Sequence, residues 1–269
     1  MRFTKHKLGC FAKLAMTIRM VLLEQNSEIV VFPSKRNTVR LVGGIVEKRF
    51  PSEEAAEFEA EAIERLNAAG VRVPHPIIRE GCIIKMPYIE GETLPDFIVR
   101  MEKLSDQSSL AKAAAGVISW FDDFYNATKG EEEISGINCD LTGLEKIREI
   151  SGKISGQEEI NEISGGITGR KKIREIRGDI NGRNFLWDGE HCWGVDFEEY
   201  ACGVIEEDIG RLIAFVLTYD PPGTEIKTVF ADRLLYEACR VLSADEDAVL
   251  FYRDQEFTAI SARRNHPQP

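Results

Sequence analysis

The sequence has no apolar run approaching the length of about 18 residues that a membrane-spanning helix needs, which excludes a membrane span. It is also short of basic residues, with 34 lysines and arginines against 45 aspartates and glutamates and a formal net charge of −11. Because phosphate neutralisation supplies much of the affinity for nucleic acids, this acidity argues against nucleic acid as a main partner. Closely spaced cysteine pairs are missing too, so the six scattered cysteines are expected to be reduced thiols in a cytoplasmic protein.

What is present is a chain of 269 residues, 43% hydrophobic and 29% charged, which is enough for one large domain or two lobes. Residues 1–24 differ from the remainder because they carry five basic residues and one acidic residue, leaving about −15 for the rest. We interpret this segment as an N-terminal appendage outside the core fold. An amphipathic helix that touches a membrane surface is the alternative interpretation.

The first half of the chain has the pattern of a small antiparallel sheet with one helix. Short runs rich in β-branched residues, separated by turn residues, predict three strands at 29–32, 38–42 and 45–50. Ser52 then provides an N-cap for a helix that runs to about residue 69 and stops at Gly70. Two further strands are expected at 77–79 and 82–86. The predicted order is therefore β-β-β-α-β-β.

Beyond residue 91 the pattern becomes helical, most clearly at 108–125, where one apolar stripe recurs at helical spacing. Residues 131–172 are different, since Ile-Ser-Gly recurs irregularly among charged residues. Their density of glycine and serine disfavours a stable helix, so we interpret the segment as a low-complexity insertion. A repeat-built structural module is the alternative.

Candidate catalytic residues follow this insertion, around a predicted hairpin of strands at 185–187 and 191–195. Asp179 lies just before the hairpin, Asn184 at its start and Asp196 at its end. Phosphoryl transfer requires such a set, because one carboxylate faces the attacking hydroxyl while two hard oxygen ligands hold magnesium. Aspartate and asparagine are common at turns, so the ordered set carries the prediction rather than any one residue.

A second group of candidates lies upstream. In the third strand Lys48 shares a face with the apolar Val46 and Phe50, a placement that suits a lysine facing a nucleotide or a snorkelling edge lysine. Glu59, eleven residues later, falls on the predicted helix among several other glutamates. On its own Glu59 would be assigned to a solvated acidic face.

Together, residues 28–90 and 173–219 resemble the aminoglycoside phosphotransferase and choline kinase branch of the protein-kinase-like fold. The matching pieces are NTVRL, IVEKRF, FEAEAIERLNAAGVRVP, IIKMPYIEGETL, RGDINGRNFLW, GVDFEEY and EEDIGRL. The resemblance implies an α+β fold of two lobes, with an antiparallel β-sheet N-lobe that has one helix and a mainly helical C-lobe. The N-lobe would span 25–88 and the C-lobe 89–262, with the insertion inside the C-lobe.

The resemblance implies a role for each matched residue in an ATP- and Mg²⁺-dependent phosphotransferase that acts on a hydroxyl of a small molecule. Lys48 would hold the α- and β-phosphates of ATP, and Glu59 would anchor Lys48. Asp179 would be the catalytic carboxylate that accepts the proton of the acceptor hydroxyl. Asn184 and Asp196 would bind Mg²⁺.

The hinge between the lobes would meet the adenine edge through the carbonyl of Pro87 and the amide of Ile89. No glycine-rich loop joins the first two strands, and the polar segment 34–37, which includes Asn37, would cradle phosphate there instead. Asp208 would brace the catalytic loop from the following helix.

Two departures from the family pattern stand out. Arg177 replaces the usual histidine before Gly-Asp, so the hydrogen bonding inside the loop must differ. The triad that begins at Asp196 reads Asp-Phe-Glu rather than Asp-Phe-Gly. Two alternatives stay open. An atypical protein kinase of the RIO-like or tRNA-modification-associated kind shares the catalytic pattern, although the missing Asp-Phe-Gly weighs against it. A regulatory pseudokinase that binds nucleotide is kept open by Arg177 and the insertion.

Overall fold

The computed structural model describes residues 29–32, 34, 36–128 and 174–265, so the segments 1–24 and 131–172 lie outside the described residues. The chain divides into two compact units. The first contains 73–90, 196–198 and the described residues up to 68, and the second contains 69–72, 91–195 and the chain from 199 onward. The chain thus leaves the first unit after Glu90 and returns to it for three residues that begin at Asp196.

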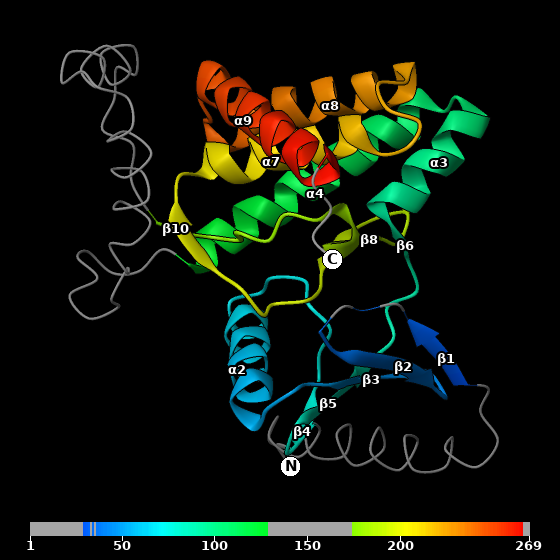
Figure 1. The fold of residues 1–269 in the computed structure, drawn as a ribbon, viewed down its shortest axis with the longest axis vertical. Helices are drawn as coiled ribbons and strands as arrows, with labels where there is room; N and C mark the ends of the chain where they lie inside the picture. The colour runs from blue at the N-terminus through cyan, green and yellow to red at the C-terminus, as the bar shows by residue number, and fades with distance from the viewer. Residues whose placement is uncertain (1–28, 33, 35, 129–173, 266–269) are drawn as a thin grey trace, which may run out of the picture. The chain divides into compact units, whose positions relative to one another are not determined.

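The sheet of the first unit has five strands in the order β1-β2-β3-β5-β4, and every neighbouring pair is antiparallel (Figure 1). Gly43 and Gly44 join β2 to β3 with φ values of 58° and 82°, and such a two-residue turn with positive φ suits a twisted hairpin. The predicted strands are confirmed to within a residue or two. Their bounds are β1 Ile29–Phe32, β2 Thr38–Val42, β3 Ile45–Arg49, β4 Ile78–Glu80 and β5 Ile83–Pro87.

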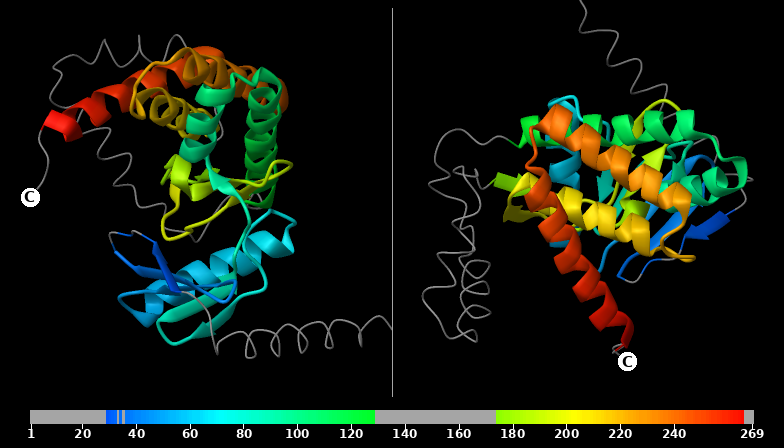
Figure 2. Two further views of the ribbon diagram at one scale, coloured as in Figure 1. Left: turned by 90° about the vertical axis from the view of Figure 1, so that its right-hand side faces the viewer. Right: turned by 90° about the horizontal axis from the view of Figure 1, so that it is seen from above.

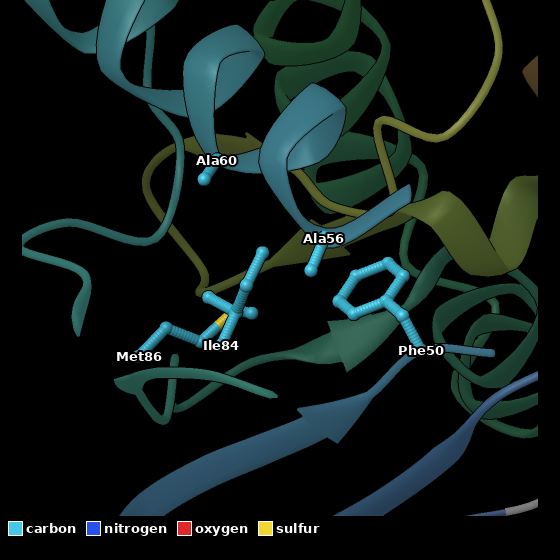
Figure 3. Close-up of a cluster of buried hydrophobic side chains, with 5 residues drawn as sticks. All are labelled: Phe50, Ala56, Ala60, Ile84 and Met86. Carbon is cyan, nitrogen blue, oxygen red and sulfur yellow. The ribbon is translucent and has the colours of Figure 1, made fainter. Parts of the chain in front are cut away.

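Helix α2 (Glu53–Ala68) packs on this sheet. The predicted N-cap is confirmed, because the main-chain N–H of Ala55 donates to Oγ of Ser52 at 3.2 Å. Figure 3 shows Ala56 and Ala60 of α2 beside Phe50 and Ile84, and these four residues are buried together with Met86. Small alanines on this face let the helix approach the sheet closely, and this cluster fixes α2 over β3 and β5.

The second unit is mainly helical, and its apolar stripe at α4 is buried as predicted. Helix α8 packs beside α4 and α7, and α9 crosses α7 (Figure 2). Gly210 permits this crossing, because a Cβ atom there would lie 2.6 Å from the carbonyl oxygen of Val249. The helices among its described residues are α3 Leu94–Leu104, α4 Gln107–Ala127, α7 Ile205–Thr218, α8 Glu225–Glu237 and α9 Glu246–Asn265, with a π-helical turn at Ala238–Leu242.

Short strands of the second unit form a three-stranded sheet, β6-β8-β9, and a separate antiparallel pair, β7 with β10. Trp187 of β8 fits against Gly116 of α4, and Trp120 of α4 fits against Gly194 of β9. These two contacts hold the predicted hairpin on α4. The bounds are β6 Glu92–Thr93, β7 Arg174–Ile176, β8 Phe185–Trp187, β9 Cys192–Gly194 and β10 Ala201–Gly203.

Cysteine chemistry differs from the expectation of reduced thiols throughout. Cys202 is disulfide-bonded, so the expectation is wrong for this residue. Among the described residues, Cys82, Cys192 and Cys239 are free thiols. Within the same described residues, none of the helices is long and apolar enough to span a bilayer.

Candidate active site

Lys48 is the centre of a polar cluster inside the first unit. It lies on β3 between β2 and β5, opposite Val39 and Ile84, and is 6% exposed. Its Nζ lies 2.6 Å from Oε2 of Glu59 and 2.5 Å from Oδ1 of Asp196. The structure therefore brings together three of the residues singled out in the sequence, and Glu59 belongs to a buried ion pair rather than a solvated face.

Glu198 is a fourth member of this cluster that the sequence analysis did not assign to the site. Its Oε1 lies 2.7 Å from Nζ of Lys48, and it also accepts a hydrogen bond from Nδ2 of Asn37. Asn37, expected to meet phosphate, is thus bonded to a carboxylate here. The available signal was the third residue of the Asp-Phe-Glu triad, where a glycine would have no side chain to offer.

The charge of the cluster is strongly unbalanced. Burial lowers the pKa of Lys48, but the negative charges of Glu59 and Asp196 outweigh that effect and leave the pKa above its ordinary value. Lys48 is consequently an ammonium at neutral pH. Oxygens of Glu59, Asp196 and Glu198 all lie within 4.8 Å of one another, so three carboxylates share one ammonium. Hard oxygen donors with excess negative charge fit a divalent cation such as Mg²⁺, and Asp196, one of the two predicted Mg²⁺ ligands, belongs to this set.

The predicted adenine-binding residues lie at the end of β5. Pro87 is the last residue of that strand, opposite Ile45, and Ile89 follows two positions later, half-buried. Between them the N–H of Tyr88 donates to the carbonyl of Gly44 at 3.1 Å, which attaches this segment to the β2–β3 turn. Both residues are therefore in the first unit, immediately before the chain enters the second.

In the second unit, Asp208 organises the loop that contains Asp179. The Asp208 carboxylate is 0% exposed and accepts the main-chain N–H groups of Arg177 at 2.7 Å and Gly178 at 3.1 Å. Gly178 has a φ of 71°, a conformation that suits glycine, and a Cβ atom added there would lie 3.0 Å from Cβ of Ala201. Burial raises the pKa of Asp208 to about 6, although these hydrogen bonds oppose the shift. These two hydrogen bonds are the contacts by which Asp208 would brace the loop.

Asp179 and Asn184 meet in the same loop. Nδ2 of Asn184 donates to Oδ2 of Asp179 at 3.1 Å, while the Asp179 residue remains exposed. A one-turn helix at Gly182–Asn184, capped by the side chain of Asn181, turns the chain between them. An exposed carboxylate held by an amide can accept a proton from an incoming hydroxyl.

The hairpin links this loop to Asp196 along the chain. The N–H of Val195 donates to the carbonyl of Asn184 at 2.9 Å, and Asp196 is the next residue. Asp196 itself has a φ of 66°, in the left-handed region that residues other than glycine seldom adopt. Asp179 and Asn184 thus form one described set in the second unit, and Lys48, Glu59 and Asp196 form another in the first.

Comparison with solved structures identifies the fold as protein-kinase-like. A gentamicin–APH(2")-IIa complex matches with a TM-score of 0.56 and 14% identity, covering 93% of this chain and 90% of that one. Amicoumacin kinase hAmiN in complex with AMP-PNP, Ca²⁺ and Ami has a TM-score of 0.54 and 13% identity, covering 99% and 91%. A choline kinase from Cryptosporidium parvum has a TM-score of 0.50 and 14% identity, covering 93% and 95%.

These matches confirm the predicted α+β, protein-kinase-like fold and its likeness to the aminoglycoside phosphotransferase and choline kinase structures. At this identity they establish fold and not activity. No family model and no curated protein sequence matches the chain.

Proposed function

We propose that the protein is an ATP- and Mg²⁺-dependent phosphotransferase that transfers the γ-phosphate to a hydroxyl of a small molecule. The observation that carries the proposal is the buried ammonium of Lys48, held at 2.6 Å by Glu59 and at 2.5 Å by Asp196. A lysine fixed in this way is suited to neutralise phosphate oxygens. The small-molecule acceptor is supported by the gentamicin complex and the choline kinase among the structures of the same fold.

In this proposal the first unit binds the nucleotide. Lys48 contacts the α- and β-phosphates, Glu59 fixes the Lys48 side chain, and Asn37 contributes a polar group from the β1–β2 turn. The carbonyl of Pro87 accepts from the adenine amino group, which requires no N–H at proline, and the N–H of Ile89 donates to the ring. We propose a cytoplasmic location as part of the same hypothesis, because the ATP donor is plentiful there.

The second unit supplies the acceptor chemistry. Asp179 orients the acceptor hydroxyl and accepts its proton as the oxygen attacks the γ-phosphorus and the bond to the ADP oxygen breaks. Asn184 and Asp196 would hold Mg²⁺, which when bound neutralises charge on the phosphate oxygens. The acidic net charge of −11 favours a cationic acceptor over an anionic one.

The test is a screen for acceptor-dependent ADP release. The full chain with MgATP is assayed against aminoglycosides, macrolides, choline, ethanolamine, sugars and a generic protein substrate, with Asp179→Asn as the control for contaminating kinases. ADP release by the wild type with a small molecule, together with no such release by Asp179→Asn, supports the proposal. Release with the protein substrate alone favours a protein kinase, and tight MgATP binding without turnover on any acceptor favours a regulatory pseudokinase.

A further inference from the structure

Arg177 is a charged residue in the interior of the second unit. Its side chain is among the largest that are fully buried, with 0% exposed. Nη2 donates to the carbonyl of Val195 at 2.8 Å and Nη1 to the carbonyl of Glu199 at 3.4 Å. The guanidinium therefore bonds to two main-chain carbonyls that are four positions apart in the chain.

These two carbonyls flank a short functional segment. Val195 immediately precedes Asp196, and Glu199 immediately follows Glu198, so Arg177 holds the chain on both sides of the residues that contact Lys48. Within that segment Asp196 has a φ of 66°. An uncommon backbone conformation at a residue other than glycine persists when the surrounding structure holds it in place.

The main chain of Arg177 is fixed independently of its side chain. Its N–H donates to the buried Oδ2 of Asp208 at 2.7 Å, and its carbonyl accepts from the N–H of Asp179 at 2.8 Å. Arg177 is therefore bonded through its main chain to Asp208, which supports the catalytic loop, and through its side chain to the backbone on either side of residues 196–198. Arg177, which departs from the histidine of the family pattern, thus has specific hydrogen-bond partners for both its main chain and its side chain.

We infer that Arg177 is a positioning residue that sets the backbone of residues 196–198 and so aims the Asp196 carboxylate. A histidine at this position offers at most two ring donors on a short side chain, whereas a guanidinium presents five donors in a rigid fork. That fork reaches two carbonyls at once. For catalysis the inference rests on the proposed kinase function, but the positioning itself is testable without any substrate.

The first experiment measures amide hydrogen exchange in the full chain for three proteins: wild type, Arg177→Met and Lys227→Met. Methionine keeps most of the side-chain length and removes the donors. Lys227 is the matched control, because it is also a fully buried cation of the second unit, bonded to Glu102 at 2.8 Å and to the carbonyl of Pro221. Loss of either cation will lower overall stability, so general destabilisation affects both variants.

We expect exchange in peptides that contain residues 196–199 to rise roughly tenfold or more in Arg177→Met, the scale of a lost hydrogen bond to a charged donor. The same peptides should change little in Lys227→Met. If the exchange rate of these peptides is unchanged in Arg177→Met, or rises equally in both variants, the inference is overturned. If Arg177→Met does not fold, Arg177→Lys serves in its place, because lysine retains a donor but not the fork.

The second experiment separates this inference from the proposed function. If the wild type is an active kinase, the Mg²⁺ concentration for half-maximal turnover should rise roughly tenfold in Arg177→Lys, and Arg177→His should recover part of the difference. Lys227→Met should retain the wild-type Mg²⁺ dependence. A wild type with no activity on any acceptor counts against the proposed function alone, since the exchange measurement still decides the role of Arg177. An active wild type with identical Mg²⁺ dependence in all variants overturns the positioning role.

Discussion

The phenol of Tyr125 donates a hydrogen bond to Oδ2 of Asp208 at 2.9 Å, with both side chains buried in the second unit. Tyr125 comes from α4 and Asp208 from α7, so this bond joins two helices behind the loop that contains Asp179. Asp208 thereby has three donors: this phenol and the N–H groups of Arg177 and Gly178. Burying a carboxylate to hold a loop costs folding free energy, and that cost depends on pH.

Replacing Asp208 with asparagine should change how stability depends on pH. The folded-state pKa is raised by burial from 3.8 to about 6, so between these values the folded protein keeps a proton that the unfolded chain releases. The contribution of Asp208 to the free energy of unfolding therefore falls as the pH rises from about 4 to about 6, by about 3 kcal/mol. Urea unfolding of wild type and Asp208→Asn across this range should give converging or crossing curves. Parallel curves would contradict the assigned titration.

Removing the Lys48 ammonium should destabilise the fold as well as impair nucleotide use. Lys48→Met leaves Glu59, which is 1% exposed, without its cation, and the expected loss is about 3 kcal/mol in urea unfolding at neutral pH. Adding Glu59→Gln should restore part of that stability. The matched control is Lys85→Met in β5, whose partly exposed ion pair with Glu80 should contribute less than about 1 kcal/mol. Equal losses of unfolding free energy in Lys48→Met and Lys85→Met would contradict the claim that the buried Lys48 ion pair stabilises the fold more than a partly exposed one.

Substitution of Asp179 should affect turnover, whereas substitution of Asp196 should affect nucleotide binding. Asp179→Asn removes the proton acceptor and should lower turnover by roughly 100-fold or more while MgATP affinity changes little. Asp196→Asn should lose Mg²⁺-dependent nucleotide binding, and because asparagine tolerates positive φ the backbone at 66° is retained. Calorimetry with and without Mg²⁺, beside ADP release on an active acceptor, measures both. Equal loss of nucleotide binding would refute the two separate roles.

Gly210→Ala should be destabilising even though alanine favours helix formation. The new Cβ would lie 2.6 Å from the Val249 carbonyl oxygen and 2.7 Å from the Arg253 nitrogen, both main-chain atoms of α9. We expect a loss of about 1–3 kcal/mol in thermal or urea unfolding from this overpacking. Gln255→Ala, at an exposed position of α9, should stay within about 0.5 kcal/mol of wild type. Comparable stability of the two variants would mean that α9 shifts freely on α7.

Local patterns predicted most of the regular structure. The strands of the first unit, α2 and the Phe185–Trp187 hairpin strand follow from alternation, capping and turn residues, which act over a few positions. The pairing of Lys48 with Glu59 was predicted from the family likeness and is present at 2.6 Å. Without that likeness Glu59 was assigned to a solvated acidic face, because five other glutamates share its helix.

What the sequence did not predict depends on long-range contacts. The hydrogen bonds of Arg177 reach carbonyls 18 and 22 positions away, and Glu198 contacts Asn37 across 161 positions. Strands β7 and β10 have three residues each, too few for an alternation pattern to be recognised.

The interlocking of Trp187 with Gly116 and of Trp120 with Gly194 has an optical consequence. The chain has three tryptophans, and the third, Trp193, is on β9 with its ring nitrogen bonded to Asp188 at 2.8 Å. All of the indole emission of the protein therefore originates on the hairpin between Asn184 and Asp196 or on the helix beneath it. Intrinsic fluorescence thus gives the native, unlabelled chain a reporter for the part of the molecule that carries the proposed metal ligands.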